Sequence, residues 1–236
     1  MVNYFTAAGE RHCFKESNNQ DAVMYRENER YCVIALTDGV SSCKYAREGA
    51  ALACESAAEH LIENAERFFA MGARQTTEAL ISRILRRLQS AADAISAPVE
   101  EFSSTLACVL ADKESGKLLY LNIGDSLIMA VRGEECYVVA MPADSRNGCY
   151  VTTTWNAAQS ARCGMIDTQQ ISSVMICSDG AWKLMYKRSR LQSSVREMIL
   201  DQQFDRLKEA LRQFQRPDDC SFITMDLSSI ARRKPI

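Results

Sequence analysis

Two Asp-Gly dipeptides come directly after short apolar segments of this 236-residue chain. Asp38-Gly39 follows Ile34-Ala35-Leu36, and Asp179-Gly180 follows Val174-Met175-Ile176-Cys177. An Asp-Gly pair after a strand is ordinarily a turn, in which Asp caps the backbone and Gly supplies a positive φ. Each dipeptide alone favours that interpretation. Because both apolar segments are typical of buried strands, however, the two carboxylates are expected at strand ends.

Three more acidic residues border apolar segments. Asp21 precedes the first segment, Asp125 lies between two segments in the middle of the chain, and Asp218 precedes the last. Taken singly, each is typical of a surface turn. Carboxylates brought together repel one another, and burying them is unfavourable unless a positive charge neutralises them. Hard divalent cations prefer oxygen ligands, so the five acids predict a site for Mg²⁺ or Mn²⁺. With only two histidines and no Cys-x-x-Cys pair, zinc is less plausible.

Composition excludes several classes of protein. The 28 basic and 30 acidic residues give a net charge of −2, which argues against a polybasic nucleic-acid binder. The 47% hydrophobic content and only 4 prolines argue against a disordered chain. No apolar run is long enough to span a membrane, and the first residues lack the pattern of a signal peptide. We therefore expect a cytoplasmic protein with no membrane partner, whose ten cysteines are free thiols.

Segments with two different periodicities alternate along the chain. Helical spacing of apolar residues predicts helices over 50–68, over 81–95 and over 191–214, with a break near Asp201 in the last. Short segments rich in Val, Ile, Leu and Tyr predict strands over Tyr31–Thr37, Thr105–Ala111, Lys117–Ile123, Leu127–Val131, Cys136–Ala140, Ser173–Cys177 and Phe222–Leu227.

The close spacing of the central strands favours antiparallel pairing, because parallel strands need a longer crossover. We expect an α+β fold of three or four layers, with helices on the outer faces of packed sheets. The polar segment 141–170 is interpreted as a long loop or flap. A single domain is expected over 1–228, followed by a short basic tail over 229–236.

Six segments, taken in order, resemble the metal-dependent type 2C protein serine/threonine phosphatases, and their divergent bacterial branch fits best. The resemblance extends from about Gly9 to Leu227, and it is specific because of the order and spacing of the segments. They are Asn19-Gln20-Asp21-Ala22, Thr37-Asp38-Gly39-Val40, Ser103-Ser104-Thr105, Asn122-Ile123-Gly124-Asp125-Ser126, Cys177-Ser178-Asp179-Gly180 and Asp218-Asp219-Cys220-Ser221.

The resemblance implies a four-layer α/β/β/α sandwich of two antiparallel sheets, and it assigns roles to individual residues. Asp38 would bridge two metal ions, with the Gly39 carbonyl on one of them. Asp179 and Asp218 would complete the first ion's shell, and Asp21 would serve the second. Asp125 would hold a third, weaker ion together with Asp179. Asp21, Asp38, Asp179 and Asp218 would thus form the catalytic set.

The implied reaction is hydrolysis of phosphoserine or phosphothreonine in proteins by a water that bridges two Mg²⁺ or Mn²⁺ ions. No nucleophilic Cys or Ser has an obvious partner, so a covalent intermediate is not required. The partners would be a phosphoprotein and a cognate Ser/Thr kinase in bacterial signalling, and a monomer is expected. Two alternatives stay open: a weak or inactive phosphatase-like regulator that binds phosphoproteins, and a small-molecule phosphomonoesterase.

The chain departs from the family pattern where substrate phosphate would bind. Many relatives have an Arg five residues before the position of Asp21, and this chain has Glu16 there. Lys15 or Arg11 could substitute, although an ammonium does not pair with phosphate in the bidentate way of a guanidinium. His12 is a candidate general acid, although a structural role is favoured for it. Further along, Ser41-Ser42 replaces a Gly-Gly pair, His60 is expected to be structural and Trp182 is expected to be a packing residue.

Overall fold

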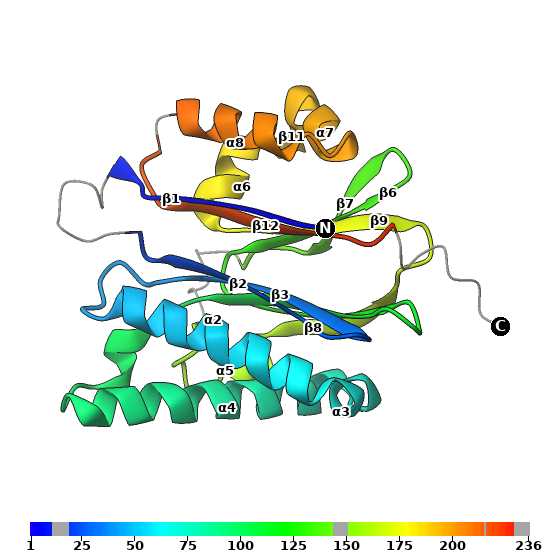
Figure 1. The fold of residues 1–236 in the computed structure, drawn as a ribbon. Coiled ribbons are helices and arrows are strands. Elements are labelled where there is room, and N and C mark those ends of the chain that lie inside the picture. The colour runs from blue at the N-terminus through cyan, green and yellow to red at the C-terminus, as the bar shows by residue number, and fades with distance from the viewer. Residues whose placement is uncertain (11–18, 144–150, 215, 229–236) are drawn as a thin grey trace.

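A computed structural model describes residues 1–10, 19–143, 151–214 and 216–228, and in it two five-stranded sheets stack face to face (Figure 1). All pairing within both sheets is antiparallel. One sheet has the order β2 (Asp21–Glu27), β3 (Tyr31–Asp38), β4 (Leu106–Asp112), β5 (Lys117–Ile123) and β8 (Arg162–Asp167). The other has the order β1 (Val2–Ala7), β12 (Cys220–Asp226), β9 (Ile171–Cys177), β6 (Leu127–Arg132) and β7 (Glu135–Ala140).

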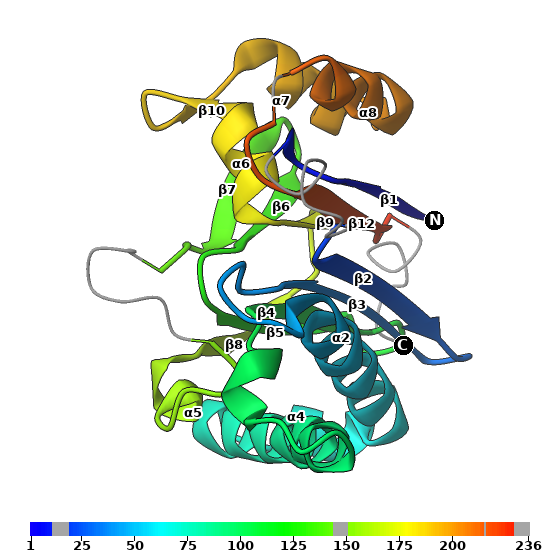
Figure 2. The same cartoon turned by 90° about the vertical axis from the view of Figure 1, so that its left-hand side faces the viewer.

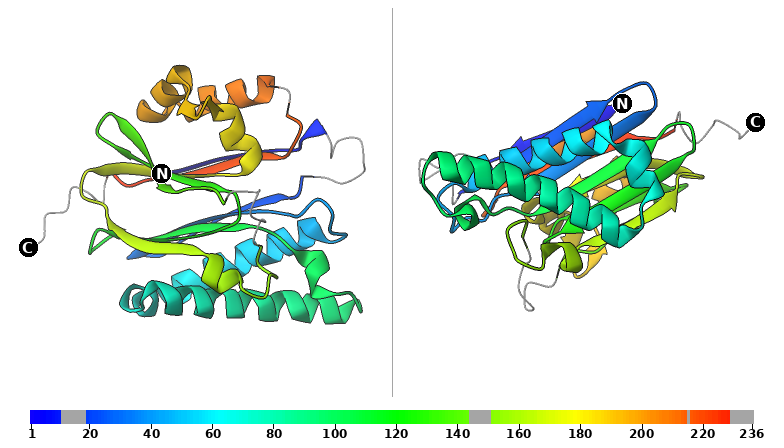
Figure 3. Two further views of the ribbon diagram at one scale, coloured as in Figure 1. Left: turned by 180° about the vertical axis from the view of Figure 1, so that it is seen from behind. Right: turned by 90° about the horizontal axis from the view of Figure 1, so that it is seen from below.

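Helices cover both outer faces, which gives four layers (Figures 1 and 3). The sheet that begins with β2 is covered by α2 (Ala46–Glu63), α3 (Ala65–Ala70) and α4 (Ala73–Ala94). The other sheet is covered by α6 (Asp179–Met185), α7 (Ser193–Leu200) and α8 (Phe204–Gln213). The predicted α+β sandwich of two antiparallel sheets flanked by helices is therefore confirmed.

Strand β3 is apolar on both faces because successive side chains pack against different layers of the sandwich. Val33 and Ala35 pack toward the helices, whereas Ile34 and Leu36 enter the cluster between the two sheets. All four are fully buried. A strand covered on both faces appears in the sequence as a continuous apolar run rather than an alternating one.

Small residues allow α2 to lie close to its neighbours. Ala50, Ala53 and Ala57 recur along its buried face. A side chain at Gly49 would place Cβ 2.1 Å from the carbonyl oxygen of Phe102, in the short 3₁₀ helix η1 (Val99–Phe102). Since η1 leads directly into Ser103-Ser104-Thr105, this contact helps to fix the entry to β4.

The seven predicted strands are confirmed, and so are the three helical regions. The third region divides near Asp201 into α7 and α8, as expected. The helix expected from residue 50 begins at Ala46, and Asn64 separates α2 from α3.

The prediction of a loop over 141–170 is wrong for its second half. That half holds the one-turn helix α5 (Ala157–Ser160) and the strand β8. β8 is an edge strand with exposed and half-buried residues, so it lacks the apolar run that signals a buried strand. β1 and β2 were also not predicted. β1 lies at a sheet edge, and β2 has no fully buried residue.

The remaining described elements are the short strands β10 (Tyr186–Lys187) and β11 (Arg190–Leu191), which form a hairpin beside α6. Every cysteine in the described ranges is a free thiol. Within those ranges, no helix combines the length and apolar character that a membrane span requires. The expected basic tail, 229–236, lies outside the described residues.

Candidate active site

The structure brings acidic residues of both sheets to one end of the sandwich. Asp38 ends β3 and faces Asp21, the first residue of β2, in the strand register. Asp125 follows β5, Asp179 begins α6 directly after β9, and Asp218 precedes β12. A cavity of about 310 Å³ opens there, lined by Asp38, Gly39, Val40, Ser41, Ser103, Thr105, Asp125, Val151, Asp179 and Asp218. Four of the five predicted acids thus share one cavity, and Asp21 lies beside it.

Thr105 holds Asp38 in place. The Asp38 backbone N–H donates a 2.9 Å hydrogen bond to Oγ1 of Thr105, and the Thr105 N–H donates a 2.8 Å bond to the Asp38 carbonyl. Gly39 forms an isolated bridge with Ser104. The Ser103-Ser104-Thr105 segment therefore fixes the end of β3, and with it the direction of the Asp38 side chain.

Neither Asp-Gly dipeptide is a turn with a left-handed glycine. Among the described glycines, those with positive φ are Gly116, Gly124 and Gly133. At Gly39, a Cβ would lie 2.7 Å from the carbonyl oxygen of Ala46, and at Gly180 it would lie 2.0 Å from that of Asp219. The glycines are needed for close backbone approach, and the turn interpretation is wrong for both dipeptides.

Asp219 joins three chain segments at the edge of the site. Its carboxylate accepts a 2.8 Å hydrogen bond from the Gly9 N–H and a 2.7 Å bond from the Gln20 N–H. The side chain is almost completely buried. A Cβ at Gly9 would lie 2.3 Å from the carbonyl carbon of Asp218, so the backbones are in tight contact. Asp219 lies directly after Asp218 and binds Gln20, which lies directly before Asp21. It therefore holds the segments that carry Asp218 and Asp21 next to each other.

The sequence signal for Asp219 is the acidic doublet Asp218-Asp219 before the last strand. An acidic doublet directly before a buried strand places one carboxylate toward solvent or ligand and the other into the protein. A buried carboxylate needs hydrogen-bond donors, and the backbone N–H groups of chain ends close to it can supply them.

Burial, and after it repulsion by neighbouring carboxylates, determine the electrostatics of Asp38. Burial raises its pKa well above the usual range, and the carboxylates of Asp21, Asp179, Asp125 and Asp218 raise it further. Carboxylates that share a buried site resist ionisation together. A cation placed among them would relieve both effects.

Both carboxylate oxygens of Asp21 are buried. Burial raises its pKa to about 7, the hydroxyls of Ser221 and Ser178 work in the opposite direction, and Asp219 and Asp179 add to the rise. Neither carboxylate oxygen accepts a hydrogen bond of normal geometry from any described residue. Two buried oxygens in this state are suitable ligands for a cation.

A tryptophan and a lysine of α6 support Asp125 and Asp179. Trp182 Nε1 donates a 2.8 Å hydrogen bond to the Asp125 carbonyl, so the expected packing residue also fixes the turn after β5. Lys183 Nζ pairs with Oδ2 of Asp179, while Oδ1 of Asp179 has no hydrogen-bond partner among the described residues. Burial raises the pKa of Asp125, the charge of Asp179 raises it further, and Lys183 partly offsets both.

The donor set fits a hard divalent cation, although no ready-made single-ion site is present. Within the described part of the chain, no three His, Cys, Asp or Glu side chains converge tightly enough to hold one ion. The acids are instead spread around one cavity, all of them oxygen donors, and three of their buried oxygens lack partners among the described residues. Oxygen-only donors with unmet bonding capacity favour Mg²⁺ or Mn²⁺ over zinc.

The candidate phosphate-binding residues Arg11, His12 and Lys15, and Glu16 in the position of the family's Arg, lie outside the described residues. What the structure describes is the anchoring of their segment through Gly9 and Gln20. His60, in α2, packs edge-on against Phe68 with ring centroids 5.4 Å apart and contacts Asn64, which suits the structural role expected for it.

Comparison with known proteins gives the same family as the sequence motifs. The family model described as Protein phosphatase 2C matches residues 8–215. Ser/Thr phosphatase Stp1 from Staphylococcus aureus is 16% identical with a TM-score of 0.68, over 95% of this chain and 94% of that one. A bacterial serine phosphatase is also 16% identical, with a TM-score of 0.66 over 94% and 96%.

RsbX, solved in complex with magnesium, is 13% identical with a TM-score of 0.59, over 94% of this chain and 92% of that one. No curated protein sequence matches. At these identities the solved structures show a shared fold, and the family model extends over most of the chain. The chain belongs to the protein phosphatase 2C family.

Proposed function

We propose that this protein is a Mg²⁺- or Mn²⁺-dependent phosphatase that hydrolyses phosphoserine and phosphothreonine in proteins. The observation that carries the proposal is the cavity at which Asp38, Asp125, Asp179 and Asp218 meet from four different chain segments, in a member of the 2C family. These carboxylates repel one another in a buried setting, and a cation among them would offset that repulsion.

The proposed ligands follow the chemistry of the donors. Asp38 and the Gly39 carbonyl, with Asp179 and Asp218, would hold one ion, and Asp38 with Asp21 would hold a second. Asp125 and Asp179 face the same cavity and could share a third. Bound ions would supply a nucleophilic water and offset the negative charge on the phosphoryl oxygens.

The chain's own contribution is to hold these oxygens before substrate arrives. Thr105 fixes Asp38, and the bonds of Asp219 to two backbone N–H groups fix the segments that carry Asp21 and Asp218. Preorganised polar groups in a partly buried cavity need no rearrangement during the reaction. Arg11 and Lys15 remain the proposed ligands of the substrate phosphate, and His12 a proposed proton donor.

A second candidate, a phosphoprotein-binding regulator without turnover, is favoured by one contact. Nζ of Lys183 forms an ion pair with Oδ2 of Asp179. If that pair persists when cations are present, Asp179 has one oxygen fewer for an ion.

Hydrolysis of a phosphothreonine peptide with Mn²⁺ tests the proposal. We expect turnover that EDTA and Asp38→Asn both abolish, while Asp205→Asn leaves it unchanged, because Asp205 is exposed on α8 and its ion-pair partner among the described residues is Lys208. Absence of turnover with every divalent metal, together with retained metal binding, would favour the regulator. Faster hydrolysis of small phosphometabolites than of phosphopeptides would favour a small-molecule phosphomonoesterase.

We extend the proposal to the setting of the reaction. A Ser/Thr kinase must supply the phosphoprotein substrate, because phosphoserine and phosphothreonine arise by phosphoryl transfer to hydroxyls. A cytoplasmic location and a monomeric state remain part of the proposal.

A further inference from the structure

A second cavity adjoins the catalytic one. It measures about 560 Å³ and is lined by Asp125, Leu127, Val138, Met141, Pro142, Ala143, Trp182, Lys183, Tyr186 and Ser189. We call it the α6 groove. Asp125 lines both cavities, and Lys183, which lines the groove, pairs with Asp179 of the catalytic cavity. The two cavities are therefore neighbours, with Asp125 and the Lys183–Asp179 pair at their boundary.

The α6 groove is built for an apolar side chain. Leu127 and Val138 are aliphatic, and Trp182 and Tyr186 present aromatic rings 6.4 Å apart at an angle of 84°. Met141 is 59% exposed at the rim. Rigid aromatic rings beside aliphatic side chains give a large apolar contact area with little loss of side-chain freedom on binding.

A basic hairpin borders this groove. Figure 2 shows β10 projecting beside α6, and Tyr186 and Ser189 of the hairpin line the groove. Its other residues include Lys187, Arg188 and Arg190, which are all exposed. No described residue forms an ion pair with any of the three, so their charges are available to a ligand.

The turn of the hairpin fixes the backbone positions from which these side chains extend. β10 and β11 pair Tyr186 with Leu191 and Lys187 with Arg190. The two residues between them, Arg188 and Ser189, have φ values of 49° and 61°. Two-residue hairpin turns with two left-handed residues normally use Asn-Gly, and Arg-Ser is unfavourable in that conformation. Backbone strain of this kind is typical of sites where a side chain is needed for binding.

We propose that the α6 groove and the basic hairpin bind the phosphoprotein substrate beside its phosphorylated residue. The groove would take one large apolar side chain, and Lys187, Arg188 and Arg190 would pair with acidic residues farther along the same segment. The proposal rests on the phosphatase function proposed above. Its specific content is a preference for phosphosites flanked by an apolar and then by acidic residues.

Two phosphothreonine peptides test this preference. One carries Leu and then two Glu on each side of the phosphothreonine, and the other carries Ala and two Gln at the same places. We expect the KM of the first peptide to be lower by about tenfold or more, with similar kcat, since three exposed ion pairs and one apolar contact together exceed one factor of ten. Equal KM values for the two peptides would overturn the proposal.

Charge removal in the hairpin assigns the effect to its residues. The triple variant Lys187→Gln, Arg188→Gln, Arg190→Gln should raise the KM of the acidic peptide about three- to fivefold, which is the charged part of the preference, and leave that of the Ala-Gln peptide unchanged. A matched variant with Arg67→Gln, Arg83→Gln, Arg86→Gln removes three exposed charges from α3 and α4 and should change neither KM. Equal effects of the two variants would show a general charge effect and would contradict a hairpin site.

Met141→Ala separates the apolar part of the proposal. It should reduce the advantage of a Leu peptide over an Ala peptide at constant acidic residues, and an unchanged advantage would contradict the groove as the binding site.

Hydrolysis of p-nitrophenyl phosphate by the unmodified protein and by each variant separates the phosphatase function from the proposed substrate-binding site. If the unmodified protein hydrolyses neither this compound nor either peptide, the phosphatase function itself fails. If it hydrolyses all of them without preference, only the substrate-binding inference fails.

Discussion

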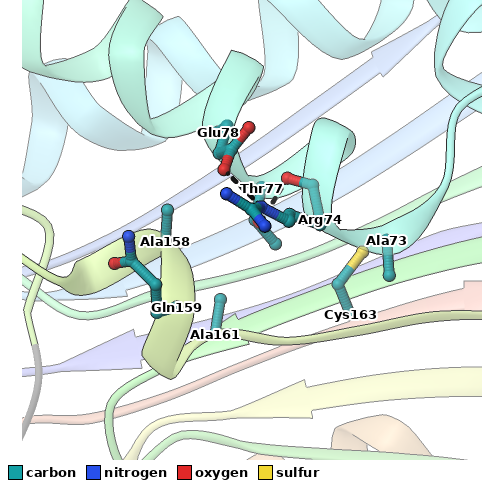
Figure 4. A pocket seen from close by; sticks show the side chains of 8 residues that line it. All are labelled: Ala73, Arg74, Thr77, Glu78, Ala158, Gln159, Ala161 and Cys163. Atoms are coloured by element: carbon teal, nitrogen blue, oxygen red, sulfur yellow. Dashed lines mark hydrogen bonds and ion pairs between the residues drawn. The ribbon is translucent and has the colours of Figure 1, made fainter.

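The acidic cavity at the strand ends, lined by four of the five predicted acids, differs from the cavity between α4, α5 and β8 in what the side chains leave unsatisfied. The cavity between α4, α5 and β8, drawn in Figure 4, is the larger of these two at about 420 Å³ against 310 Å³. Its lining charges, Arg74 and Glu78, satisfy each other through a 2.8 Å ion pair one helical turn apart. At the strand ends, by contrast, carboxylates face each other and their pKa values are raised by burial and repulsion. Unmet charge, rather than volume, distinguishes the functional candidate.

The largest expected effect is on catalysis at the acidic cavity. Asp38→Asn keeps the shape of the side chain and removes the charge that would bridge two ions, so kcat should fall by about a thousandfold or more. Glu78→Gln changes a carboxylate in the cavity of Figure 4 in the same way and should leave kcat unchanged. Steady-state hydrolysis of a phosphothreonine peptide measures both, and comparable losses would remove the distinction between the two cavities.

The next largest effect concerns Asp219, which we interpret as a positioning residue. Asp219→Asn places an amide N–H against the N–H of either Gly9 or Gln20, so one of the two anchoring bonds is lost. We expect about a 10- to 100-fold weaker activation by Mn²⁺ with the fold retained, as for other residues that orient metal ligands.

Mn²⁺ titrations of activity, with the thermal midpoint in EDTA as the folding control, test this expectation. Unchanged Mn²⁺ dependence would limit Asp219 to a structural role.

A smaller effect is expected on the stability of the metal-free protein, which the variant Asp21→Asn should increase rather than decrease. Burial raises the pKa of Asp21 to about 7, from an unfolded value near 3.8. Between those pH values the folded state binds more protons than the unfolded state, so the stability of the metal-free protein should fall as pH rises from about 4 to 7. Asp21→Asn should remove that part of the pH dependence and raise the thermal midpoint in EDTA at neutral pH.

Thermal unfolding across this pH range, in EDTA and in excess Mg²⁺, measures the effect. In excess Mg²⁺ the order should reverse, because the variant loses a proposed ligand while the unmodified protein gains binding energy. A variant that is less stable than the unmodified protein in EDTA at pH 7 would contradict the conclusion that burial and repulsion make the Asp21 carboxylate unfavourable there.

The smallest effect is predicted in the cavity of Figure 4. Arg74→Gln breaks the ion pair with Glu78 at a side chain that is 87% exposed, so the thermal midpoint and the activity should both stay within experimental error. A clear loss of activity would show that the cavity between α4, α5 and β8 also takes part in function.

Much of the fold and of the site could be predicted from the sequence because both depend on local patterns. Buried strands such as β3 and the second half of β9 are continuous apolar runs, and an acid one or two residues after such a run lies at a strand end. The order of six short motifs then indicated the family, which the comparison with known proteins established.

Edge strands and tertiary hydrogen bonds could not be predicted in this way. β8 exposes half of its residues, so its pattern resembles that of a polar loop. Asp219 is nearly 200 residues from Gln20 in sequence, and only the folded structure shows that its carboxylate binds that backbone N–H. The glycines of the Asp-Gly pairs indicated turns, whereas their actual role depends on Ala46 and Asp219 lying close by in space.

Anomalous diffraction from crystals soaked in Mn²⁺ tests the central claim most directly. The claim is that the acids at the strand ends form a divalent-cation centre. We predict at least two manganese peaks within coordination distance of Asp38, Asp179, Asp218 and Asp21, and none in the cavity between α4, α5 and β8. An acidic cavity without a peak at saturating Mn²⁺, with Lys183 still paired to Asp179, would contradict it.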